Sequence, residues 1–123
     1  TTGAQNTGVG MSTLKANTTA NNNVAVGYEA MKLNTTGHSN TAVGTTAAYT
    51  LVDGNYNVAV GKDALYSNSG GGHNVAIGFN AAYENLASDV IAIGKQAMEA
   101  NTAAIPVAVA LPTSAPSISA MRS

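Results

Sequence analysis

Residues 57–61 read Asn-Val-Ala-Val-Gly, and close variants of this five-residue pattern recur along the whole chain. Successive copies lie 17 residues apart, except for the last step of 16, and they close with the glycines Gly10, Gly27, Gly44, Gly61, Gly78 and Gly94. A fixed period of this length is typical of a solenoid, in which each coil buries its apolar side chains only by stacking on its neighbours. The pattern therefore predicts an all-β fold, a parallel β-roll or β-solenoid of six coils of about 17 residues.

The two positions before each glycine define the faces of the predicted strands. The position next to the glycine is always Val or Ile, as in Val60 and Ile77, and the position before it is Ala in five copies, as in Ala59. Successive side chains of a strand point to opposite faces, so the two columns must lie on opposite faces of the sheet. We expect the β-branched column to point into the core. The alanine column should then lie against a close neighbour that leaves no room for larger side chains.

A second short apolar segment follows each glycine. The third residue after it is Ala in five of six copies, and the fourth is Leu, Met or Ala. We expect this segment to form the opposite wall of a narrow core, joined to the strand by turns such as residues 34–37 and 67–72. The glycine column is expected to provide a backbone angle or a close approach that a Cβ atom would prevent. A helical alternative is disfavoured by the density of Gly, Asn and Thr.

Asparagine occupies two further columns of the repeat. The first set begins the strand segment and comprises Asn6, Asn23, Asn40, Asn57 and Asn74, and the second lies seven residues after the glycine and comprises Asn17, Asn34, Asn68, Asn85 and Asn101. Stacked coils place identical side chains about 4.8 Å apart, and an amide can donate to one neighbour and accept from the other. Both columns are therefore expected to form structural ladders, with ligand binding as the weaker alternative.

Composition limits the classes of partner. The chain has 123 residues, five Lys and Arg against six Asp and Glu, and only 9% charged residues, so it lacks the basic surface that binds nucleic acid. The longest apolar stretch, residues 103–111, is about half of what a membrane span requires, and we expect no membrane insertion by this segment. No cysteine is present, which excludes disulfides and thiolate metal sites.

The two ends of the chain differ from the repeat. Residues 1–6 match residues 35–40, which join one coil to the next, so the chain is expected to start within a coil and to be a fragment of a longer protein. We expect a solenoid domain over residues 1–103. Residues 104–123 alternate apolar residues with Ala and Pro at first, and they are expected to form a non-repeat extended cap or a linker, two alternatives that the pattern leaves open.

No catalytic constellation is visible. His38 and His73 fall at different places in the repeat, no acid recurs beside them, and the six acidic residues are scattered over unrelated columns. Paired carboxylates, a nucleophile with its base, and a metal ligand set are therefore all without support. We expect solvent-exposed histidines, no metal or other cofactor, and no enzymatic activity.

One column could bind a ligand. Tyr49, Tyr66 and Tyr83 lie five residues after their glycines on three successive coils, so their rings should stack into an aromatic strip. Because sugars pack against aromatic side chains, this strip is the candidate ligand-binding site. The alternative is a purely structural stack that stiffens the array or packs against a neighbouring subunit.

The sequence motif Asn-x-Ala-Val/Ile-Gly-x-x-Ala, with Asn-rich turns between its copies, resembles the YadA-like head repeats of trimeric autotransporter adhesins and similar repeats in bacteriophage tail fibres. The resemblance covers residues 1 to about 100. It implies a left-handed parallel β-roll assembled as a homotrimer, outside a cell or on a virion. The small size of the alanine column makes it the expected close-packed interface between the chains.

The turn at residues 34–40 favours the phage version, which implies a tail-fibre segment involved in host attachment through a cell-surface glycan or protein receptor. The head of a bacterial surface adhesin and a purely structural virion or fibre protein remain the alternatives.

Overall fold

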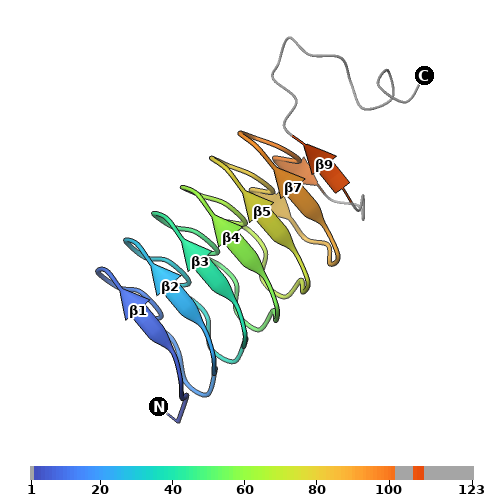
Figure 1. Ribbon diagram of the computed structural model, residues 1–123. Coiled ribbons are helices and arrows are strands. Elements are labelled where there is room, and N and C mark those ends of the chain that lie inside the picture. Colours follow the sequence, from blue (N-terminus) through green and yellow to red (C-terminus); the bar gives the residue numbers. More distant parts are fainter. Residues whose placement is uncertain (1, 102–106, 110–123) are drawn as a thin grey trace, which may run out of the picture.

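The computed structural model describes residues 2–101 and 107–109, and these contain short strands but no helix (Figure 1). The strands are β1 (Thr7–Val9), β2 (Val24–Val26), β3 (Thr41–Val43), β4 (Val58–Val60), β5 (Val75–Ile77), β6 (Glu84–Asn85), β7 (Ile91–Ile93), β8 (Ala100–Asn101) and β9 (Val107–Val109).

Seven of these strands form one parallel sheet in the order β1-β2-β3-β4-β5-β7-β9. The register aligns each repeat with the next, so that Ala42 pairs with Ala59 and Ala59 with Ala76. Each of the five steps from β1 to β7 closes one turn of the chain, and Figure 1 shows the turns stacked along one axis. The prediction of an all-β parallel β-solenoid is confirmed.

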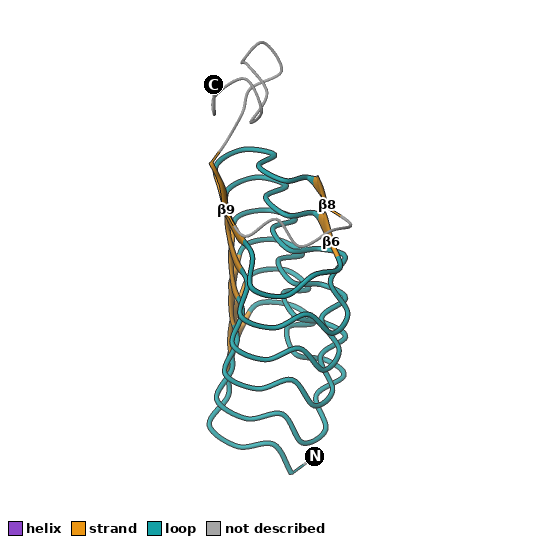
Figure 2. Cartoon of the chain, turned by 90° about the vertical axis from the view of Figure 1, so that its right-hand side faces the viewer, coloured by secondary structure: helices purple, strands orange, loops and turns teal. Residues whose placement is uncertain are grey.

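The second wall of the roll is mostly irregular. Figure 2 shows the long sheet on one side and loops on the other, where β6 and β8 form the second sheet. Elsewhere single backbone hydrogen bonds connect this wall from coil to coil, such as Met31 N–H to Ala47 C=O at 3.0 Å and Ala48 N–H to Ala64 C=O at 2.9 Å. Each turn therefore positions the same side chain directly beside its copy in the next turn.

The core is lined by alanine, which reverses the expected orientation of the strands. Ile77 is 38% exposed and Val60 is half-buried, so the β-branched column points outward. The column predicted to be an interface is instead completely buried inside the roll and comprises Ala25, Ala42, Ala59, Ala76 and Ala92. The expected core and the expected interface are therefore exchanged, as happens when a strand register is off by one residue.

The physical reason is the narrowness of the roll. The facing wall presents its own small side chains, including the buried Ala47 and Ala64, so only a methyl group fits between the walls at this level. The first coil shows the same constraint: Gly8 replaces the strand alanine where Thr13 replaces the facing alanine, and a Cβ on Gly8 would lie 2.8 Å from Thr13 Oγ1. The predicted second wall is confirmed by the burial of side chains such as Leu65.

The glycine column has both features expected from the sequence, a special backbone angle and a close approach that a Cβ atom would prevent. Gly44 has φ of +136°, and a Cβ built on it would lie 2.7 Å from the carbonyl carbon of Gly61 in the next coil. Any side chain here would force the coils apart.

Three non-glycine residues in every turn also have positive φ. In one turn they are Glu29 (56°), Met31 (49°) and Ser39 (59°), and the equivalent positions repeat these values along the array. A left-handed conformation costs an L-residue about 1–2 kcal/mol. The roll therefore depends on the hydrogen bonds and contacts between coils to hold a backbone that no isolated turn would favour.

The first asparagine column forms the predicted ladder. The Oδ1 atom of Asn57 accepts the backbone N–H of Asn74 at 3.0 Å, and its Nδ2 donates to Gly71 C=O at 2.8 Å. At every step from Asn23 to Val90, the backbone N–H of one residue in this column donates to the side-chain oxygen of the asparagine one coil earlier. The last of these bonds joins Val90 N–H to Asn74 Oδ1. These buried amides join strand and turn in consecutive coils.

In the second asparagine column, the ladder prediction is wrong for Asn17 and Asn34. Asn17 and Asn34 bond within their own turns, three residues ahead, as in Asn34 Nδ2 to Gly37 C=O at 3.0 Å. Asn68 accepts from Gly71 N–H in the same way, although its Nδ2 also reaches Ala87 C=O in the next coil. These side chains close the turns locally.

At the C-terminal end, β9 pairs with β7 in the repeat register, Ala92 opposite Ala108. The residues Val107-Ala108-Val109 follow β7 by 16 residues and continue its pattern, within a segment that was expected to be non-repeat. The expected cap or linker otherwise lies outside the described residues.

Candidate functional site

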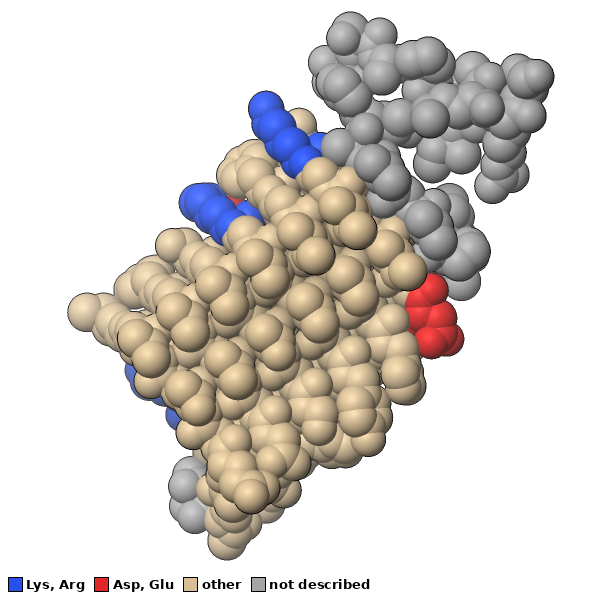
Figure 3. Space-filling model, viewed as in Figure 1, with Lys and Arg blue, Asp and Glu red and all other residues tan. Residues whose placement is uncertain are grey.

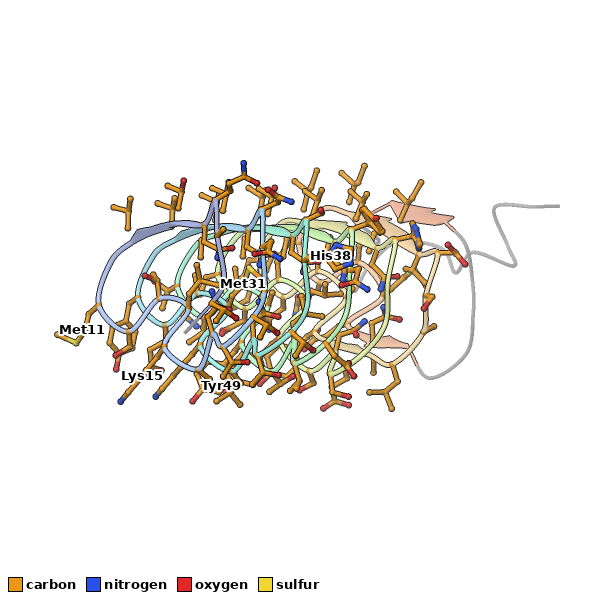
Figure 4. All side chains as sticks on the ribbon, turned by 90° about the horizontal axis from the view of Figure 1, so that it is seen from below. Met11, Lys15, Met31, His38 and Tyr49 are labelled. Carbon is orange, nitrogen blue, oxygen red and sulfur yellow. The ribbon has the colours of Figure 1, made fainter. Side chains whose placement is uncertain are left out.

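The tyrosine strip is present as predicted. The rings of Tyr49 and Tyr66 are parallel within 5° with centroids 5.1 Å apart, and those of Tyr66 and Tyr83 are parallel within 4° at 4.9 Å. All three side chains are half-buried. In Figure 4, Tyr49 and Lys15 point away from the roll on the face opposite the long sheet. The strip therefore lies on a surface that remains free when the sheet face is covered.

The stacking changes what the strip can offer a ligand. Parallel rings about 5 Å apart cover each other's faces, so both faces of Tyr66 are occupied by its two neighbours. Burial, followed by the neighbouring Tyr83 and Tyr49, raises the pKa of the Tyr66 hydroxyl. Tyr66 is consequently a neutral hydroxyl, able to donate and accept hydrogen bonds, rather than an activated base or nucleophile.

A cation closes the first end of the strip. Lys32 occupies the same column one coil before Tyr49, and its Nζ lies 5.6 Å from the centroid of that ring. The same Nζ lies 2.6 Å from Glu29 Oε1, and this hydrogen bond lowers the pKa of Glu29 and raises that of Lys32. Beside the strip, Thr50 Oγ1 donates to Tyr66 C=O at 2.7 Å and ties neighbouring coils together.

A second aromatic cluster lies on the turns before the asparagine ladder. The His38 and Tyr56 rings meet at 87° with centroids 5.3 Å apart, and Tyr56 stacks on His73 at 5.1 Å and 24°. His73 Nδ1 lies 3.9 Å from Asp89 Oδ1. His38 and His73, which fall at different places in the repeat, thus both contact the ring of Tyr56, and Tyr56 is 53% exposed.

Sequence reasoning missed this cluster although its signal was present. Tyr56, His73 and Asp89 each immediately precede a ladder position, so one column carries them all. Within residues 2–101 and 107–109 no group of three or more His, Cys, Asp or Glu side chains could hold a metal ion.

The outer face of the long sheet is the third candidate surface. Two columns of side chains point outward, one next to the glycines and one two residues earlier, and none of them is charged. In Figure 3, which views this face, charged residues lie only at its margins. Within the stack these side chains range from half-buried, as at Val60, to 42% exposed at Ile93.

The row of residues around the corner, at the end of the strands, is mixed in character. The residue after each glycine is exposed there: Met11, Tyr28 and Phe79 are apolar, whereas Thr45, Lys62 and Lys95 are polar or charged. We call the two outward columns of the long sheet, without this mixed row, the apolar sheet face.

No protein-family model matches this chain, and no curated protein or solved structure matches it either. In the described part of the chain, no helix is long and apolar enough to cross a membrane.

Proposed function

We propose that this chain is a structural and adhesive segment of an extracellular trimeric fibre, of the bacteriophage tail-fibre kind, that takes part in attachment to a host cell. The observation that carries the proposal is the apolar sheet face. A row of uncharged, mostly β-branched side chains repeats at every coil along a straight stack, and an exposed surface of this kind typically marks an interface.

A second copy of the chain is the occupant that fits this surface best. The outward columns of neighbouring copies carry no like charges to repel each other and have the same spacing along the axis, so different columns of this face can pack against each other around a three-fold axis. This replaces the alanine column as the expected site of association, because the alanines are inside the roll. The number three rests on the resemblance of the repeat to trimeric fibres and adhesin heads.

The size of the face sets the strength of the assembly. Six strands about 4.8 Å apart and three residues of about 3.3 Å give a flat area of roughly 300 Å². A stable interface buries about 800 Å² per partner. The exposed corner residues Met11, Tyr28 and Phe79 must therefore contribute, because the two neighbours in a closed ring of three divide this one face between them.

Sedimentation velocity of the full chain tests this proposal. We expect one species of three chains, and we expect Val43→Glu, which places a carboxylate in the apolar sheet face, to shift it to monomer at micromolar concentration. Ser69→Glu adds the same charge to an exposed turn and should leave the trimer intact. A parent chain that is a folded monomer throughout would refute the fibre proposal.

The genetic neighbourhood separates the phage fibre from its main alternative. Adjacent tail genes would support the fibre, whereas a downstream membrane barrel would indicate the head of a bacterial surface adhesin. A trimer that binds neither cells nor glycans would leave the purely structural fibre protein.

A further inference from the structure

The tyrosine strip presents a ladder of hydroxyl groups instead of open aromatic faces. The two faces of Tyr66 are covered by the adjacent rings at 5.1 and 4.9 Å. Figure 4 shows Tyr49 directed away from the roll, so ring edges and phenolic hydroxyls are what a ligand meets. Each hydroxyl can donate one hydrogen bond and accept another. The strip therefore suits a ligand that is itself rich in hydroxyl groups.

The charges around the strip favour a neutral ligand. At the first end Lys32 is already paired with Glu29 at 2.6 Å, and only the exposed Lys15 lies beyond it in the column. At the other end Glu84 and Glu99 add two negative charges. The two carboxylates would repel a polyanion, and the lysines would repel a polycation. An uncharged polymer is repelled by neither group.

The spacing of the rings selects among neutral polymers. An extended peptide advances about 3.3 Å per residue and about 6.6 Å between side chains on the same face, and neither length matches the ladder. An extended glycan with equatorial linkages advances by nearly one coil spacing per sugar. Successive sugars, each turned over relative to the one before, can then meet successive tyrosines through alternating hydroxyl-bearing edges.

We propose that the strip of Tyr49, Tyr66 and Tyr83 binds a neutral, extended, β-1,4-linked glycan that lies parallel to the roll axis with one sugar on each tyrosine. The inference rests on the proposed attachment function and deepens it. It is independent of the apolar sheet face, because the strip lies on the opposite side of the roll. In a trimer three strips face outward, and their combined binding compensates for a weak affinity at each one.

A length series of linear sugars on the full chain tests the proposal. Saturation-transfer NMR and calorimetry would compare β-1,4-linked oligomers of glucose and of N-acetylglucosamine, one to six units long, with α-1,4-linked glucose oligomers of the same lengths. We expect affinity for at least one β-linked series to rise up to three sugars and then level off, because three tyrosines are available. Equal affinity for the α-linked and β-linked series, or no dependence on length, would overturn the proposal.

Tyr66→Phe tests the hydroxyl ladder without disturbing the stack. We expect it to weaken binding of the β-linked trimer about fivefold, which corresponds to one hydrogen bond of about 1 kcal/mol. Tyr56→Phe removes a hydroxyl from the other aromatic cluster and should change nothing. Loss of binding in Tyr56→Phe with full binding in Tyr66→Phe would contradict the assignment. A trimer in sedimentation that binds no glycan would defeat this inference alone, and a monomer that binds would defeat the proposed assembly alone.

Discussion

Replacing Asn57 by Ala should be among the most destabilising single changes in the roll. The Asn57 amide is buried, and its Oδ1 and Nδ2 satisfy Asn74 N–H at 3.0 Å and Gly71 C=O at 2.8 Å. Both backbone groups belong to buried residues and would be left without their partners. At about 1–3 kcal/mol for each buried unsatisfied group, the expected loss is about 2–6 kcal/mol.

Urea denaturation followed by circular dichroism measures this loss, at one fixed chain concentration because assembly couples to stability. With a slope of about 2 kcal/mol per molar urea, the midpoint should fall by about 1 M or more. The matched control is Asn55→Ala in the same turn, where a half-exposed amide accepts only His38 N–H at 2.8 Å and water can replace it. If the two variants differ by less than about 0.5 kcal/mol, the ladder does not hold the coils together.

Three further changes test other parts of the structure. Ala59→Leu should overpack the narrow core and cost about 1–3 kcal/mol, whereas Val60→Thr on the outer face should be milder in a denaturant titration; the reverse order would mean that our strand orientation is wrong. Gln96 is exposed and has φ of 59°, so a change to Val should lower the melting temperature, whereas a change to Gly should not. Equal melting temperatures of the two variants would show that backbone strain at this position does not affect stability. Because the pKa of Tyr66 is raised in the folded state, the folded chain keeps a proton that the unfolded chain loses above about pH 10, so stability should fall as pH rises through the folded value. Tyr66→Phe should reduce that alkaline loss, and an unchanged pH profile would argue against the shift.

The period alone was sufficient to predict which residues lie side by side. Once coils of equal length stack in parallel, each column must meet its own copies, and the stack of Tyr49, Tyr66 and Tyr83 and the ladder through Asn57 follow from counting. The cluster around Tyr56 could have been found in the same way. His38 obscured it, because it lies one position away from the column of Tyr56 and His73.

The direction in which each strand faces could not be obtained from the sequence pattern. A strand such as Val58-Ala59-Val60 is apolar on both faces, so a period of two does not distinguish inside from outside. A preference for burying the larger residue favours valine, and the structure buries alanine. The deciding quantity is the distance between the two walls, which depends on what the facing segment contributes.

That distance is a property of the closed coil. The facing wall brings Ala47 and Ala64 to the same level as the strand alanines, and the closely spaced glycines hold the coils in register. A β-branched side chain in that gap would push the walls apart and break the hydrogen bonds between coils. The sequence by itself determined the repeat, the stacking and the aligned columns; only the closed tertiary structure, through the width of its core, decided that alanine is buried and that valine and isoleucine form the outer face.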